Sequence, residues 1–267
     1  MKIRHLFELP CRTQKPRETG LTMVIDSGLG LGTIRDLLDN CGEFVDYVKL
    51  GWGTAMISAK LEEKIALYRQ FGIPVCLGGT FFELAHIHGK VKQYRDMILE
   101  FGLQIVEVSD GTVVMSTEQK LAYIRELSRD FKVLAEFGSK DAEVVVAPSK
   151  WVAGMKREFD AGAWKCIAEG RESGTAGLYR STSELRTGLV DEIVEHIPQA
   201  NLLWEAPQKN QQAWFVKAFG SNVNLGNIAM ADVIPLETLR VGLRGDTLMT
   251  FHGHCVQSGP GTPPRKA

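Results

Sequence analysis

The acidic side chains that could do chemistry in this sequence each stand at or near the end of a short apolar run. They are Asp26, Glu107, Glu136, Glu169 and Glu205. If the fold brings them to one place, five like charges cannot all stay ionised there unless cations lie close by. Carboxylate oxygens suit Mg²⁺, which typically binds one or two carboxylates together with water and substrate oxygens. The pattern therefore predicts metal-assisted chemistry.

Basic side chains follow the same runs and predict the charge of the substrate. One run carries Lys49, and Lys140 and Arg171 lie a few residues after two others. Arginine offers a planar fork for a carboxylate or phosphate, and lysine offers a point charge whose pKa can shift. Salt bridges between the charges would explain any single residue equally well. For the whole set, a metal-assisted reaction on a small anion is the better interpretation.

The apolar runs predict the elements that position these side chains. Eight runs have the length and the Val, Ile and aromatic content of strands, and they begin near positions 21, 47, 73, 103, 132, 164, 201 and 222. Helical patterns lie between them, for example over residues 61–71, 120–129, 185–197 and 211–219. Strands that alternate with helices indicate a parallel sheet. The number of units predicts an α/β fold, a single-domain (β/α)8 TIM barrel, with an open doubly wound sheet as the alternative.

In such a barrel, catalytic groups lie at the carboxyl ends of the strands, so the charged residues are expected to meet at one mouth. The 267 residues predict an N-terminal extension over 1–19, the barrel domain over 20–252 and a disordered, Gly- and Pro-rich tail over 253–267. No linker-like stretch divides the barrel segment. We therefore expect a single catalytic domain.

Composition excludes several classes of partner. Lys and Arg number 31 against 32 Asp and Glu, a formal net charge of −1, so no basic field for nucleic acid is expected. The absence of a run of about 18 apolar residues predicts that no helix spans a membrane. Five scattered cysteines without a CxxC pair favour a reduced, cytoplasmic protein.

Two further patterns suggest cofactor sites but lack the partners that such sites need. The glycines of residues 28–32 follow a predicted strand, as in a dinucleotide-binding fingerprint, but the second strand ends at Lys49 without the acidic ribose-binding residue. The pair His86 and His88 has no carboxylate or Cys partner at zinc-ligand spacing. Neither NAD nor zinc is therefore expected.

Short motifs at the ends of the predicted strands occur in a fixed order along the chain. They include Tyr47-Val-Lys-Leu-Gly-Trp-Gly-Thr54, Gly78-Gly-Thr-Phe-Phe-Glu83, Val106-Glu-Val-Ser-Asp-Gly111, Glu136-Phe-Gly-Ser-Lys140, Gly170-Arg-Glu-Ser-Gly174, Glu205-Ala-Pro-Gln208 and Asn224-Leu-Gly-Asn-Ile228. Together with residues 236–247 they resemble the phosphosulfolactate synthase family over about residues 7 to 248. Residues 8–20 resemble the bacterial branch of that family.

This resemblance implies a (β/α)8 barrel that adds sulfite to phosphoenolpyruvate with Mg²⁺ as cofactor, giving (2R)-phospho-3-sulfolactate. By classification such an enzyme is a carbon–sulfur lyase. Lys140 matches the position proposed for the acid that protonates C2, and we expect nearby cations and metal to lower its pKa towards neutrality. The remaining roles implied are catalysis for Glu107, metal binding for Glu136, Glu169 and Asp26, and substrate binding for Lys49, Arg171, Arg244, Glu205 and Asn224.

Two other functions stay open on the sequence alone. One is a barrel enzyme that acts on another enol phosphate or another nucleophile. The other is a non-catalytic, stress-related barrel protein, because plant heat-stress-associated proteins share the barrel and some motifs. The resemblance also implies self-association as a homo-oligomer, with a trimer as the form considered.

Overall fold

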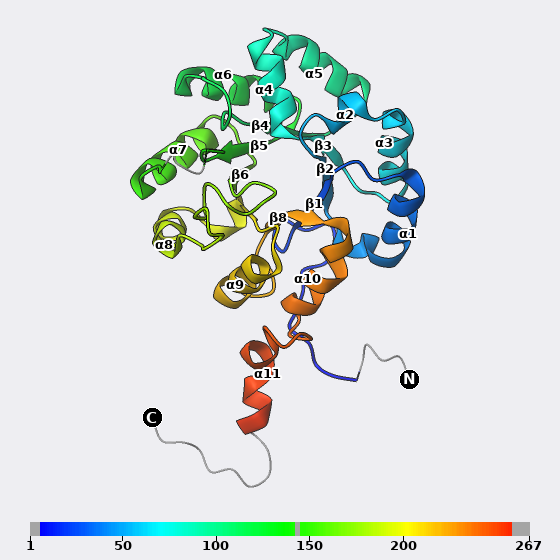
Figure 1. The fold of residues 1–267 in the computed structure, drawn as a ribbon, viewed down its shortest axis with the longest axis vertical. Coiled ribbons are helices and arrows are strands. Elements are labelled where there is room, and N and C mark those ends of the chain that lie inside the picture. Colours follow the sequence, from blue (N-terminus) through cyan, green and yellow to red (C-terminus); the bar gives the residue numbers. More distant parts are fainter. Residues whose placement is uncertain (1–5, 142–144, 258–267) are drawn as a thin grey trace.

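Eight parallel strands form the centre of the molecule, as the computed structural model of residues 6–141 and 145–257 shows (Figure 1). The hydrogen-bonded order is β3-β2-β1-β8-β7-β6-β5-β4, and β3 also contacts β4, so the sheet curls into a nearly closed barrel. The TIM-barrel prediction is thereby confirmed, and an open doubly wound sheet is excluded. The strands are β1 (Thr22–Asp26), β2 (Tyr47–Leu50), β3 (Val75–Leu77), β4 (Ile105–Val108), β5 (Lys132–Phe137), β6 (Lys165–Ala168), β7 (Leu202–Glu205) and β8 (Leu225–Ala229).

Helices surround the strands and cover the outer face of the barrel (Figure 1). In α1 the buried residues Ile34, Leu38 and Cys41 are spaced by four and three positions, so they share the helix face that packs on the sheet. The helix α6 begins at a capping box formed by Ser116 and Gln119. The α-helices are α1 (Leu31–Cys41), α2 (Thr54–Ile57), α3 (Leu61–Gln70), α4 (Gly79–Ile87), α5 (Val91–Glu100), α6 (Thr117–Leu127), α7 (Pro148–Asp160), α8 (Thr187–His196), α9 (Lys209–Phe219), α10 (Val233–Arg240) and α11 (Leu248–Gln257).

The barrel interior is apolar near the amino ends of the strands and charged near their carboxyl ends. Because side chains alternate along a strand, a residue two positions after an interior-facing residue also faces the interior. Lys49, Glu107 and Glu136 therefore lie above an apolar layer, and each is buried. That layer consists of Leu21, Met23, Tyr47, Cys76, Ile105, Leu134, Ile167 and Leu203.

The N-terminal segment, residues 6–19, contacts the amino ends of several strands. Arg12 pairs with Glu237 of α10 at 2.7 Å and donates to the carbonyl of Ser221, just before β8. Arg17 pairs with Asp46, directly before β2, at 2.9 Å. The segment thus joins distant parts of the chain at the end of the barrel opposite the charged interior.

The last helix crosses the boundary that the sequence predicts between the barrel domain and the tail. The last helix, α11, continues to Gln257, beyond residue 253 at which the sequence predicts disorder. Phe251 packs against the core, and the ring of His252 lies 3.2 Å from the carbonyl oxygen of Val241, so this part of the helix is anchored. Residues 258–267 lie outside the described residues. Within the described part of the chain, every helix is too short or too polar to cross a membrane.

Candidate active site

A cavity of about 360 Å³ opens at the carboxyl ends of the strands. It combines acidic and basic side chains with Trp52 from the loop after β2 and with small residues that follow β3 and β4. Seven residues with roles predicted from the sequence line it: Lys49, Glu107, Glu136, Lys140, Glu169, Arg171 and Glu205. The structure therefore brings most of the predicted site together at the expected mouth.

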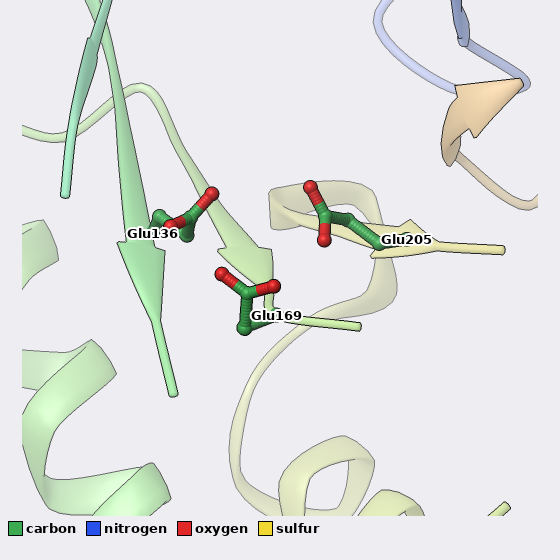
Figure 2. A group of neighbouring side chains, drawn as sticks. All are labelled: Glu136, Glu169 and Glu205. Atoms are coloured by element: carbon green, nitrogen blue, oxygen red, sulfur yellow. The ribbon is translucent and has the colours of Figure 1, made fainter. Parts of the chain in front are cut away.

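Three buried carboxylates form one group on this cavity wall. Figure 2 shows Glu136, Glu169 and Glu205 pointing toward one another from the ends of β5, β6 and β7. One oxygen from each lies within 4.8 Å of the others, a spacing at which one cation could contact all three. Glu169 Oε2 is buried and has no hydrogen-bond partner among the described residues. Burial and the charges of Glu136 and Glu205 raise the pKa of Glu169 well above its usual value.

The residues present fit a hard divalent cation such as Mg²⁺. Its preferred ligands are oxygens, and the group offers only oxygens, one of them unsatisfied. A cation would also reduce the repulsion that raises the pKa of Glu169. Glu205, which the sequence assigns to substrate binding, belongs to this group by its position.

Lys140 lies beside the same carboxylates. Its Nζ is 2.6 Å from Glu136 Oε1, 3.8 Å from Glu169 Oε2 and 3.4 Å from Glu83 Oε1. It also donates to the hydroxyl of Ser109 at 2.7 Å. Burial alone would lower the pKa of Lys140, but the carboxylates outweigh burial and raise it. This is opposite to the expected shift towards neutrality, because its neighbours are anions rather than cations.

Lys49 occupies the barrel interior between Glu205 of this group and Glu107. Its Nζ lies 3.0 Å from Glu205 Oε1 and 3.3 Å from Glu107 Oε2. Burial opposes the charge of Lys49, yet Glu107 and Glu205 raise its pKa well above the usual value. Burial raises the pKa of Glu107 to about 7. The backbone N–H of Gly79, at the start of α4, donates to Glu107 Oε1 at 2.6 Å.

Arg171 stands at the rim of the cavity, after β6. Its guanidinium donates to the carbonyl of Lys140 at 3.1 Å, and its backbone N–H donates to Glu169 Oε1 at 2.6 Å. The side chain is exposed, so it can reach a ligand that enters from solvent. Lys49, Lys140 and Arg171 thus provide positive charge in one cavity, from the buried Lys49 to the exposed Arg171.

Asp26 lies away from the carboxylate group. Interior-facing residues of β1 include Met23 and Ile25, so Asp26 points outward to the helices. Its oxygens accept hydrogen bonds from the backbone of Gly28 and Leu29, and Lys64 and Tyr68 contact it at 3.0 Å and 2.8 Å. These contacts satisfy the carboxylate without a metal.

Asn224 and Arg244 also lie outside the residues that line the cavity. Asn224 precedes β8, where its side chain accepts from the N–H of Leu21 and donates to the carbonyl of Leu202 at the amino end of the barrel. Arg244 follows α10 and lies 3.5 Å from Asp246. The sequence prediction for these two residues rested on their positions in the motifs, which do not show where a side chain points.

Glu83, Ser109 and Asn227 are among the residues near the site that were not assigned a role from the sequence. Glu83 and Ser109 contact Lys140, and Asn227 lines the cavity from the middle of β8. All three lie within motifs that resemble the family, which was the available signal. Glu83 was hard to recognise because it lies on a helix, where a lone charge is usually solvated.

Fold and cavity together define a (β/α)8 barrel with its polar site where enzymes of this architecture carry theirs. Residues 10–246 match the family model of (2R)-phospho-3-sulfolactate synthase (ComA), so the chain belongs to the phosphosulfolactate synthase family of enzymes. It is 43% identical to the phosphosulfolactate synthase of Bacillus subtilis, covering 90% of this chain and 97% of the relative. It is 39% identical to that of Methanothermobacter thermautotrophicus, covering 91% and 96%.

A solved structure supports the architecture independently. The 3-hexulose-6-phosphate synthase from Salmonella typhimurium matches with a TM-score of 0.54 and 11% identity, covering 82% of this chain and 97% of that one. At this level of identity the likeness shows the shared barrel fold alone.

Proposed function

We propose that this protein catalyses the Mg²⁺-dependent addition of sulfite to phosphoenolpyruvate, giving (2R)-phospho-3-sulfolactate. One observation carries the proposal: an oxygen-only group suited to a divalent cation lies beside Lys140 in a cavity that also contains Lys49 and Arg171. Membership of the phosphosulfolactate synthase family supports the same reaction.

Glu136, Glu169 and Glu205 would hold the cation, which when bound supplies Lewis-acid stabilisation of negative charge. The cationic side chains of the protein would bind the substrates. Lys49 and Arg171 would attract the phosphate and carboxylate of the enol phosphate and the charge of sulfite. They also reduce the repulsion between two anions that must meet in one site.

The bond changes require one proton donor. The sulfur lone pair of sulfite attacks C3 of phosphoenolpyruvate, and the C2–C3 double-bond electrons move towards C2 and the carboxylate. A C–S bond forms, and Lys140 Nζ delivers a proton to C2 on one face. Neighbouring carboxylates raise the pKa of Lys140, so the proton is present at neutral pH. Solvent then returns a proton to the amine.

The test is phosphorus NMR of the purified protein with phosphoenolpyruvate, sulfite and Mg²⁺. We expect a new phosphate-ester signal that requires all three components and disappears in Lys140→Ala. A matched control is Lys92→Ala, because Lys92 is exposed on α5. Binding of phosphoenolpyruvate without a new signal would indicate another nucleophile. Neither binding nor turnover would favour a non-catalytic barrel protein.

A further inference from the structure

Asn227 presents a buried polar group to the cavity that the protein itself does not satisfy. Its exposed fraction is 4%, and it is among the residues that line the cavity. Its Oδ1 is buried without a hydrogen-bond partner among the described residues. Buried amide groups are normally paired, so an unpaired one that faces a cavity indicates a ligand or ordered water.

An irregularity in β8 directs this side chain inward. Thr22 of β1 pairs with Leu225 and Val24 pairs with Ile228, so two steps along β1 match three along β8. The register of β8 thus shifts by one residue, as at a β-bulge, a feature that redirects side chains and is frequent next to active sites. Leu225 and Ile228 both belong to the outer core. The bulge lets Asn227, between them, line the cavity.

The backbone of Asn227 is strained in the same way as two other residues of the cavity. Non-glycine residues with positive φ in the described part of the chain are Trp52, Arg171, Ser183 and Asn227. Three of these, Trp52, Arg171 and Asn227, line the cavity. Left-handed backbone at non-glycine residues is uncommon, and such strain gathers at functional sites. Asparagine tolerates it better than most residues.

The chemistry of the amide suggests its ligand. Phosphoenolpyruvate in its anionic form offers acceptor oxygens, and a side-chain amide supplies N–H donors. A neutral donor can bind such an oxygen without adding another charge to a cavity that already contains paired lysines and glutamates. The unpaired atom is the acceptor Oδ1, and because no described residue holds it, the amide can rotate to turn its N–H donors towards the ligand.

We propose that Asn227 is a substrate-binding residue whose side-chain amide donates a hydrogen bond to an anionic oxygen of the enol phosphate. This inference rests on the proposed function, because it takes phosphoenolpyruvate as the substrate. It assigns Asn227, rather than Asn224, as the asparagine of the β8 motif that contacts the ligand.

The test uses two substitutions and one control. Asn227→Gly removes the amide and accepts positive φ without strain, so folding should be retained. Asn227→Asp keeps the shape but replaces the donor with a negative charge. Ser183→Gly relieves the same backbone strain at a residue that does not line the cavity. For each, we would measure phosphoenolpyruvate affinity by calorimetry, kcat and KM, and the melting temperature.

We expect Asn227→Gly to weaken phosphoenolpyruvate binding about 10- to 100-fold, the range for a hydrogen bond to a charged group. Asn227→Asp should weaken it further, and Ser183→Gly should leave it unchanged. The melting temperature of Asn227→Gly should not fall. Mn²⁺ affinity measured without substrate should stay the same in Asn227→Gly and Ser183→Gly.

Two results would overturn the inference alone. One is wild-type affinity for phosphoenolpyruvate in Asn227→Gly, while the parent protein binds and turns over. The other is loss of Mn²⁺ affinity in that variant, which would make Asn227 a metal ligand. If the parent protein neither binds nor turns over phosphoenolpyruvate, the proposed function fails and this inference fails with it.

Discussion

Buried carboxyl groups in the cavity link protein stability to pH. Burial raises the pKa of Glu107 to about 7, and burial with neighbouring carboxylates raises that of Glu169. Between the ordinary glutamate pKa and these values, the folded protein holds protons that the unfolded chain has released. Their contribution to stability is therefore lost as pH rises. Glu136 has the opposite effect on stability, because its pKa is lowered. That effect changes only at pH values below the ordinary glutamate pKa.

We therefore predict that the metal-free protein loses stability between pH 5 and pH 8. For Glu107 the loss is up to about 3 kcal/mol in the free energy of unfolding. Mg²⁺ should stabilise the protein more at pH 8 than at pH 5, because it binds the ionised carboxylates. Urea unfolding at both pH values, with EDTA or with Mg²⁺, measures this. Glu107→Gln should reduce the slope, and a rise in metal-free stability with pH would contradict the prediction.

Gly79 tests how closely the site is packed. A Cβ at this position would lie 2.6 Å from Glu107 Oε1 and 2.6 Å from Ser109 Cβ, too close for either to stay in place. We expect Gly79→Ala to displace Glu107 and to lower kcat/KM by about 100-fold, since small misplacements in active sites carry costs of this size. The control is Gly32→Ala in α1, where nothing lies within 4 Å. It should keep full activity and gain up to about 1 kcal/mol from helix propensity.

At the scale of single elements, strand alternation explains which site residues the sequence could predict. Lys49, Glu107 and Glu205 each stand two positions after an interior apolar residue, so they face the barrel interior. The same alternation turns Asp26 outward, because Ile25 takes the interior position. Strand parity could therefore have excluded Asp26 from the metal group. It could not have found Asn227, because apolar spacing does not reveal a bulge.

Lys120 of α6 joins three elements behind the carboxylate group. Its Nζ lies 2.8 Å from Asp110 Oδ1, 2.7 Å from Glu158 Oε1 and 2.6 Å from the carbonyl oxygen of Glu136. Lys120 and Glu158 are each 3% exposed, so this pair lies almost entirely out of water, whereas Asp110 is partly exposed. The contact with the Glu136 carbonyl links this buried network to the backbone of a predicted metal ligand.

We predict that Lys120→Met lowers the free energy of unfolding by about 3 to 5 kcal/mol, because it leaves the buried carboxylate of Glu158 without its ion-pair partner. Activity should fall about 10- to 100-fold, the usual effect of losing a residue that orients a ligand. Adding Glu158→Gln should recover part of the stability by removing one stranded charge. Urea unfolding and steady-state kinetics measure both effects. Unchanged stability in the single variant would show that the network does not operate as described.

At the scale of the whole molecule, one end of the barrel carries the charged cavity and the other end carries structural contacts. The charged cavity lies at the carboxyl ends of the strands, and the segment of residues 6–19 contacts their amino ends. The sequence indicated an extension before the first strand but not its contacts. Arg12 and Glu237 are separated by 225 positions, and local patterns carry no signal for such a pair. In barrels of this kind, the amino-terminal end contributes to stability rather than to catalysis.

Arg12→Ala tests this division of tasks. The side chain pairs with Glu237 at 2.7 Å and also donates to Asn222 and to the carbonyl groups of Ser221 and Gly20. Its loss leaves the largely buried Glu237 with Arg240, at 3.9 Å, as its remaining ion-pair partner among the described residues, so we expect a cost of about 3 kcal/mol and a melting temperature lower by about 5 to 10 °C.

KM for phosphoenolpyruvate should stay within about twofold of the parent value, because the change is at the far end of the barrel from the cavity. The control is Arg35→Ala, on the exposed face of α1, which should change stability by less than about 0.5 kcal/mol. Calorimetric melting and steady-state kinetics on the three proteins separate the two ends. A raised KM with an unchanged melting temperature in Arg12→Ala would mean that the N-terminal segment affects the cavity directly and that the two ends are not independent.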